Sequence, residues 1–429
     1  MNKKRLTRWG QNGALLLLTV SALFLLTRLF LFHESWPGGV STALDPAAPA
    51  EAPEENGLRF PSVHVMVTRD SDYGRCGTLY AAGEDAPLQQ ILPLLREALG
   101  SAGQPATAAD QTLRSALDQP SLYLDLTVQL PMEAVELWLG EDAGLEGNVR
   151  SLALTVEADD TAVLYLRYGD GAIRRCPTAL PATAVEALCQ EFAPNGSRFA
   201  YEADCGALDP YTLLTAQAPA LPDVQAGLPA GYTAYSLLTA LDFNPHTNSR
   251  YTVSGGVEVV EESPRTLRIG PDGVVSCVSS GEVSSPLFQV PSAAGESDAA
   301  GALQAAGRLA GALSGGAGAS PLYLSGMEET EEGWLIRFRC QVEGIPVLFP
   351  DESDALTVSV SGGAVTAFTY RCRSYTAEAD GISAPLTPPA MAAAMAAHQY
   401  PEEGLSIGYV DSGTGMISPC WLAGYSRQP

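Results

Sequence analysis

The sequence predicts an α+β protein: a single N-terminal transmembrane helix, then an α+β domain and two repeated helix-plus-antiparallel-sheet units. Three observations support this prediction. A long apolar stretch follows a basic N-terminus. Segments that alternate apolar and polar residues, typical of strands, are mixed with helix-like segments. A strand-and-turn pattern in the middle of the chain returns roughly ninety residues later.

The transmembrane helix is predicted at residues 13–32, "GALLLLTVSALFLLTRLFLF". About 20 apolar residues are needed to cross a bilayer. Lys3 and Lys4, the only lysines of the chain, precede this stretch, so residues 1–12 are expected to form a cytoplasmic tip. A cleaved signal peptide is the alternative, but the small residues at 41–43 lie far beyond the apolar run. In both cases most of the chain is exported.

The composition limits the classes of partner and of metal site. The 429 residues suffice for two or three domains, and their formal net charge is −25. So acidic a chain repels phosphates, which excludes nucleic acid as a partner. The eight cysteines show no C-x-x-C spacing, so a zinc ribbon is not expected. Pairing of Cys189 with Cys205 or of Cys340 with Cys372 stays open, as does their burial as small apolar side chains.

A linker and a first folded domain are expected after the membrane stretch. Residues 33–58 are rich in proline, alanine and acidic residues and are predicted to form an extended linker. Residues 59–201 are predicted to form the α+β domain. Its strands are "SVHVMVT", "SLYLDLTVQL", "VRSLALTVEA" and "TAVLYLRYG". Helices are expected at 87–100 and 179–192, with Pro93 kinking or restarting the first.

The repeat divides the remainder into a middle domain at 208–290 and a C-terminal domain at 296–429. In both copies a strand reaches a glycine turn, at Gly256 and at Gly344, and a short strand and a hairpin follow. The helix-like segments "TAYSLLTALDF" and "AAGALQAAGRLAGALSG" precede the two copies. Each helix is expected to cover one face of an antiparallel meander. A further helix, "PPAMAAAMAAHQY", and a hairpin around 412–413 close the chain.

No catalytic, metal or cofactor site is predicted. The four histidines stand in no metal-binding spacing. The string "GLSIG" follows a helix and enters a strand, so Ser406 lacks the strand-to-helix context of a nucleophile elbow. The acidic pairs lie next to turn residues, where solvated charge is expected, and do not indicate a glycosidase site.

The stretch "LDFNPHTNSRY" has part of the pattern of a calcium loop. Asp242, Asn244 and Asn248 alternate as oxygen ligands would. The sixth and twelfth positions are Thr247 and Val253, where such a loop needs glycine and glutamate. Because Asn and Asp also favour local turns, a helix-ending turn into a hairpin is preferred.

Four segments follow one another along the chain: "SALFLLTRLFLFHESW", the Phe-Asn-Pro stretch with "SGGVEVVEESPRTLRIGPDGVV", "WLIRFRCQVEGIPVLFPDESDALTVSVSGGAVTAFTY" and the final "ISPCW". In this order they resemble the YycH/YycI family of membrane-anchored regulators of the WalK/WalR (YycG/YycF) two-component system. The domain ahead of the repeats makes the chain more similar to YycH than to YycI. The positions that carry the pattern are Phe243, Asn244, Pro245, Tyr251, Gly256, Gly344, Pro419 and Trp421.

The resemblance implies a non-catalytic regulator of a cell-wall sensor histidine kinase. Its N-terminus would be cytoplasmic and the bulk of the chain extracytoplasmic at the cell membrane. The transmembrane helix would contact the kinase, and a second YycH/YycI-type protein is a further expected partner. Small and hydroxyl side chains allow close helix packing. The expected contact residues are Leu18, Thr19, Ser21, Ala22 and Leu25.

Two other functions stay open at this point. One is a membrane-anchored, PepSY-like binding module for a peptide, cell-wall fragment or small ligand, without a kinase partner. A sheet edge would take a peptide strand, and Tyr323, Trp334 and Phe349 would line a concave surface or belong to the core. The other is a hydrolase, which is disfavoured because no nucleophile has its proper context.

Overall fold

The computed structural model describes residues 57–423, apart from 70–73, 84, 158, 159, 204, 206, 282, 292–297 and 414. Its fold is mixed α+β, which confirms the α+β part of the predicted fold class. The predicted transmembrane helix, with Leu18, Thr19, Ser21, Ala22 and Leu25, lies outside the described residues. Within the described part, no helix combines the length and the apolarity needed to cross a bilayer.

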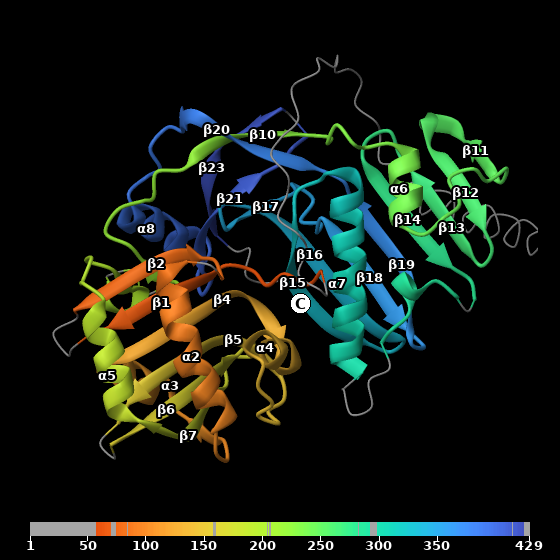
Figure 1. The fold of residues 1–429 in the computed structure, drawn as a ribbon. Coiled ribbons are helices and arrows are strands. Elements are labelled where there is room, and N and C mark those ends of the chain that lie inside the picture. Colours follow the sequence, from red (N-terminus) through yellow and green to blue (C-terminus); the bar gives the residue numbers. More distant parts are fainter. Residues whose placement is uncertain are drawn as a thin grey trace, which may run out of the picture. The chain divides into compact units, whose positions relative to one another are not determined.

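An antiparallel sheet of seven strands forms the N-terminal part, in the order β2-β1-β4-β5-β6-β7-β3 (Figure 1). Each strand predicted in this region is present, because alternation of apolar residues marks strands with one face in a core. The strands are β1 (Val63–Thr68), β2 (Arg75–Ala81), β3 (Ala106–Ala108), β4 (Ser121–Pro131), β5 (Asn148–Val156), β6 (Thr161–Tyr168) and β7 (Ile173–Pro181).

Helices cover both faces of this sheet. The face that carries Val65 packs with α2 (Ala86–Gly100), α4 (Met132–Leu139) and α5 (Ala182–Glu191). The face that carries Met66 packs with α3 (Asp110–Leu117) and with a segment made of β8 (Arg198–Phe199), the 3₁₀ turn η1 (Ala200–Glu202) and β9 (Leu213–Leu214). Both predicted helices are confirmed.

The helix α2 runs through Pro93 without an interruption. Pro93 and Gln89, whose carbonyl loses its usual amide donor, are both exposed. Water can solvate that carbonyl, and the buried side of the helix supplies six apolar side chains, so packing outweighs the local cost of proline. The expected restart of the helix at Pro93 is therefore wrong.

A second sheet of eleven strands joins the two predicted repeat units. Its order is β11-β12-β13-β14-β19-β18-β16-β17-β21-β23, with β15 also paired to β16. The strands are β11 (Arg250–Thr252), β12 (Glu258–Glu262), β13 (Arg265–Ile269), β14 (Val274–Ser279), β15 (Leu322–Thr330), β16 (Gly333–Val342), β17 (Ile345–Leu348), β18 (Leu356–Ser361), β19 (Ala364–Arg371), β21 (Leu405–Val410) and β23 (Pro419–Ala423). A small sheet holds β10 (Pro222–Gly227), β20 (Ser374–Ile382) and β22 (Met416–Ile417).

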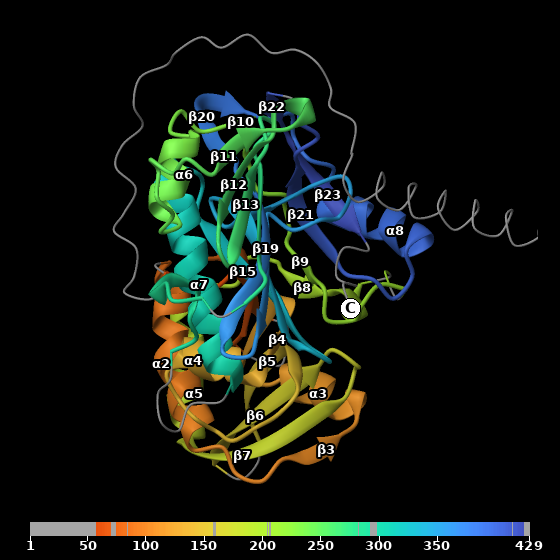
Figure 2. The same ribbon diagram turned by 90° about the vertical axis from the view of Figure 1, so that its right-hand side faces the viewer.

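The last strands of the two repeat copies, β14 and β19, pair antiparallel. The hairpins β13–β14 and β18–β19 therefore lie in mirrored order on either side of this junction. The copies differ in their second strand: β12 lies between β11 and β13, whereas β17 lies outside β16 and pairs with β21. The helices α6 (Ala234–Ala240) and α7 (Asp298–Ala317) cover one side of the sheet, and α8 (Pro389–Gln399) lies on the other (Figure 2).

The stretch after α6 is a helix-ending turn, as preferred from the sequence. Asp242 has a left-handed φ of 57°, and the side chain of Asn244 accepts a hydrogen bond from the amide of His246 at 3.0 Å. The buried Arg265 donates to the carbonyl oxygens of Leu241 (3.2 Å) and Asp242 (2.7 Å), which are freed at the end of the helix. Its guanidinium also packs over Phe243, 4.0 Å from the ring centre.

We predict that cysteines replacing Ser276 and Thr369 will form a disulfide. These residues lie directly opposite each other on β14 and β19, where Cβ atoms come within about 5.5 Å. Because the eight native cysteines are free thiols, mass spectrometry after mild oxidation and digestion would look for the peptide pair that links the two introduced cysteines. The control pairs Ser276→Cys with Ala367→Cys, a diagonal neighbour at about 7–8 Å. Equal oxidation of both pairs would contradict the continuous sheet.

Candidate ligand-binding site

A cavity of about 60 Å³ lies where three parts of the fold meet. The sheet of the N-terminal part, the strands β15 and β16, and the hairpin β21–β23 each contribute to its wall. Polar side chains line it although the surrounding cores are apolar. The polar residues of the lining include His64, Asp125, Thr127, Arg150, Arg167, Asp209, Thr212 and Arg339.

A row of polar side chains crosses four neighbouring strands at one height. His64 of β1 is paired with Asp125 of β4, Asp125 with Ser151 of β5, and Ser151 with Arg167 of β6. Directly opposed residues point to the same face of a sheet. The next row, from Met66 onward, is apolar and packs into the core. The sheet thus changes from core to polar site within two residues along each strand.

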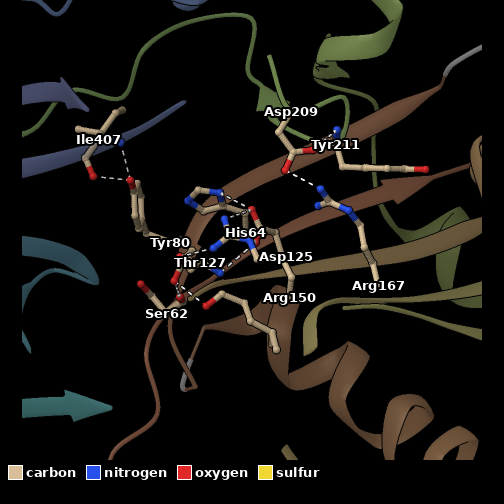
Figure 3. Close-up of polar contacts among 11 residues, drawn as sticks. Ser62, His64, Tyr80, Asp125, Thr127, Arg150, Arg167, Asp209, Tyr211 and Ile407 are labelled. Atoms are coloured by element: carbon tan, nitrogen blue, oxygen red, sulfur yellow. Dashed lines mark hydrogen bonds and ion pairs between the residues drawn. The ribbon is translucent and has the colours of Figure 1, made fainter. Parts of the chain in front are cut away.

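A bulge in β4 brings a second arginine to this row. The pairing of β4 with β5 shifts between Asp125 and Leu130, and Thr127 has a left-handed φ of 62°. The Asp125 carboxylate accepts the Thr127 amide at 3.0 Å and holds this turn. Arg150 donates to the Thr127 carbonyl at 2.6 Å and to both oxygens of Asp125, at 3.1 and 3.3 Å (Figure 3).

The Asp125–Arg150 pair is largely buried, with side-chain exposures of 10% and 14%. Two oxygens meet two guanidinium nitrogens, which is the geometry that best compensates desolvation. Removing one partner of such a pair costs about 3–5 kcal/mol, because the other charge is left uncompensated.

Arg167 is held by the segment that follows the N-terminal sheet. Its Nη2 donates to the Asp209 carboxylate at 2.8 Å, and its guanidinium lies over the ring of Tyr211, 4.8 Å from the centre. The other Asp209 oxygen accepts the amide of Tyr211 at 3.1 Å (Figure 3). The segment 209–213 therefore closes one side of the cavity and carries Thr212 into its wall.

Ser62 and Tyr80 fasten the N-terminal sheet to the C-terminal strands around the cavity. The Ser62 hydroxyl donates to the carbonyl of Gly344, and within the N-terminal part the Thr127 hydroxyl donates to the Ser62 carbonyl at 3.1 Å. The Tyr80 hydroxyl donates to the Ile407 carbonyl and accepts the Ile407 amide at 2.5 Å (Figure 3). Gly344 has a φ of 80°, and a Cβ there would meet the Tyr80 carbonyl at 2.8 Å, so only glycine fits.

His64 is neutral at physiological pH. The residue is 4% exposed, and burial is the main cause that lowers its pKa to about 4; Arg150 lowers it further, while Asp125 opposes the shift. Its ring meets the Tyr80 ring edge-on at 4.6 Å. Its Nδ1 faces Asp125 Oδ2 at 3.7 Å.

Two buried polar atoms in the cavity wall have no hydrogen-bond partner among the described residues. They are Nε2 of His64 and the hydroxyl of Thr212, whose residues are 4% and 6% exposed. A buried polar group without a partner costs about 1–3 kcal/mol, so a folded protein normally satisfies it. Both residues line the same cavity, so an occupant of this cavity is the natural candidate for their missing partner.

The positions that carry the family resemblance fall mostly outside this cavity. Phe243, Asn244 and Pro245 form the turn after α6, Tyr251 is 47% exposed on the edge strand β11, and Gly256 has the left-handed φ of a turn. Pro419 and Trp421 lie in β23, where the Trp421 indole donates to the Thr387 carbonyl at 2.9 Å. Gly344 alone among them reaches the junction that bounds the cavity.

Of the residues named from the sequence, Ser406 and Tyr323 line the cavity, whereas its polar residues His64, Asp125, Arg150 and Arg167 were not predicted as a site. The signal was present: His64 in "SVHVMVT" and Asp125 in "SLYLDLTVQL" interrupt otherwise apolar strand interiors. The strand pairing that brings these residues together cannot be predicted from a single sequence. Ser406 lies in β21 and its side chain contacts the Tyr80 hydroxyl, while His398 is exposed on α8. Of Tyr323, Trp334 and Phe349, Tyr323 lines this cavity, while Phe349 belongs to the core and Trp334 packs against it.

Known proteins offer no match. No model of a protein family matches the chain, and neither a curated protein nor a solved structure is significantly similar to it.

We predict that His64 makes the protein sensitive to mild acid. The folded state keeps His64 neutral down to a pKa of about 4, whereas the unfolded chain binds a proton near 6.5, so stability is full above pH 6.5 and is lost as the pH falls toward 4. Between pH 7 and pH 5 this amounts to about 2 kcal/mol of unfolding free energy. Urea titrations at both pH values would measure it.

The control for this prediction is His64→Gln, which keeps a polar side chain but does not titrate. The loss between pH 7 and pH 5 should be about 2 kcal/mol smaller in the variant than in the natural protein. The same loss in both proteins would mean that His64 is not the acid-sensitive group.

Proposed function

We propose that this chain is a non-enzymatic binding protein whose junction cavity takes a small polar ligand, with the stretch 13–32 holding the exported body at the membrane. The observation that carries the proposal is the pair of buried, unpartnered atoms, His64 Nε2 and Thr212 Oγ1, in the wall of one cavity. Ligand pockets combine apolar walls with a few convergent polar groups, and this cavity has both.

The position of the cavity links ligand binding to the arrangement of the fold. Its wall includes Asp125 of the N-terminal sheet, Arg339 of the large sheet and Leu422 of the last strand. A ligand that bonds across these parts stabilises the arrangement in which they meet. Binding in this cavity would therefore be suited to sensing.

The first test is the recovery of a bound compound from the purified full chain. Released by denaturation and analysed by mass spectrometry, the natural protein should yield a small molecule in near-equal molar amount. Thr212→Phe should lose it, because the larger side chain fills the cavity. A matched change, Thr369→Phe, places the same ring on the exposed face of β19 and should leave the compound bound. Recovery from neither the natural protein nor the control would contradict the proposal.

A second candidate function is the regulation of a sensor histidine kinase, as the resemblance to YycH/YycI proteins implies. This candidate function also assumes the two structural features expected from the sequence, the single membrane helix and the two repeated helix-plus-sheet units. The specific observation in its favour is an exposed apolar face on α8: Met391 and Met395 are each 58% exposed and stand one helical turn apart. Tyr400, 47% exposed, follows the helix. Exposed apolar clusters mark protein–protein contacts.

In-cell photocrosslinking tests the kinase contact. A photoreactive residue at Leu18 or Leu25 would probe the membrane stretch, and one at Met395 would probe the exposed face of α8. We expect a sensor histidine kinase to be captured at these positions and not at Glu331, an exposed control in the turn between β15 and β16. Capture of lipid alone from Leu18 and Leu25, with the kinase present in the cell, would contradict kinase regulation through the membrane helix.

A further inference from the structure

We propose that the ligand of the junction cavity is a small carboxylate that carries a hydrogen-bond donor on the neighbouring carbon, as in a 2-hydroxy acid or an α-amino acid. The inference rests on the proposed function, since it names the chemical class that the same cavity would take. Three properties of the lining residues point to this class: an excess of arginine donors, one buried acceptor, and a small volume with apolar walls.

The excess of donors comes from Arg167. A guanidinium has five N–H groups. Among the described residues, Arg167 makes one hydrogen bond, to Asp209, and stacks on Tyr211. Its Nε and Nη1 are thus available to an acceptor in the cavity that it lines. A planar carboxylate matches the fork of a guanidinium, with two parallel N–H···O bonds.

Each arginine of the lining is paired with one carboxylate. Arg150 pairs with Asp125, Arg167 with Asp209, and Arg339 with Asp354 at 2.7 Å. With His64 neutral, the lining is therefore close to neutral. What attracts a carboxylate here is the N–H groups of Arg167 that its own ion pair leaves unused, and not a net positive charge.

The buried acceptor is Nε2 of His64. A neutral imidazole carries one proton, and the Asp125 carboxylate 3.7 Å from Nδ1 favours that proton on Nδ1. Nε2 is then a buried acceptor on a residue that lines the cavity, and it needs a donor on the ligand. The Thr212 hydroxyl can donate or accept and satisfies either end of such a molecule. Acetate, which has no donor, would leave Nε2 unpaired.

The size and the walls of the cavity exclude large ligands. A volume of about 60 Å³ holds roughly four water-sized groups. Four leucines in the rest of the cavity wall offer a ligand no hydrogen-bond partner: Leu213, Leu324, Leu405 and Leu422. A carboxylate, a donor-bearing carbon and a short apolar group fill this space.

Calorimetry on the full chain in detergent micelles tests the class with four probes: glycolate, glycine, acetate and ethylene glycol. We expect glycolate or glycine to bind, acetate to bind at least about fivefold more weakly, and ethylene glycol not to bind.

Three variants test the roles of the lining residues. Arg167→Gln should lower the affinity for glycolate about tenfold or more, because a charge-assisted hydrogen bond is lost. His64→Phe should remove the preference for glycolate over acetate. Arg268→Gln, an exposed arginine on β13, is the control and should change neither.

The ratio of glycolate to acetate affinity separates this role from a general loss of folding, which would weaken both probes alike. Arg167→Lys keeps the charge beside Asp209, so it should fold and retain partial binding. Ethylene glycol binding as tightly as glycolate would overturn the carboxylate class and leave the proposed function standing. If none of the four probes binds but a compound is still recovered from the natural protein, the carboxylate class is also overturned and the proposed function still stands. Tighter binding of glycine than of glycolate would identify an α-amino acid as the ligand class, and the reverse would identify a 2-hydroxy acid.

Discussion

The ion pair between Asp125 and Arg150 is the interaction on which the junction depends. Asp125 holds the Thr127 amide and thereby the bulge of β4, and Arg150 closes the same turn through the Thr127 carbonyl. The bulge directs the Thr127 hydroxyl to the Ser62 carbonyl, and Ser62 in turn reaches Gly344. One buried pair of charges thus organises both the polar row of the sheet and the contact with the strands of the C-terminal part. Its desolvation is costly, so the pair is better explained by the geometry that it imposes than by net stability.

The cavity also lies next to a contact through which ligand binding at His64 would affect the C-terminal part of the chain. Tyr80 stands between the His64 ring and the backbone of Ile407, with a left-handed φ of 56° that its surroundings must maintain. A ligand bonded to His64 would act on a ring that touches this contact. The buried alanines of α8 pack against β21 and β23, so the exposed face of this helix belongs to the part that Tyr80 fastens. Ligand binding and a protein contact could in this way be linked through a few hydrogen bonds, as regulation of a partner would require.

Sequence patterns predicted the local structure well, because apolar alternation and the helix-like segments reflect burial of one face. The strands around His64 and Asp125, the helices α2, α5, α6, α7 and α8, and the turn at Asp242–Asn244 follow from such local rules. The cavity does not, since it depends on pairings between segments far apart. Arg150 enters it through a bulge that no local signal marks, and Ser62 meets Gly344 across more than half of the chain. Pro93 shows the converse, a local rule overridden by packing.

The most direct test of the proposed binding site is the protonation state of the His64 ring, measured by nitrogen NMR on histidine-labelled protein and assigned with His64→Gln. We predict a ring that stays neutral from pH 7 to pH 5, with its proton on Nδ1, and an Nε2 signal that shifts when the cavity is filled. A ring that titrates near pH 6.5 and does not respond to any occupant would contradict it. His64 would then be a solvated histidine, and the cavity would lose the buried acceptor on which the proposed binding depends.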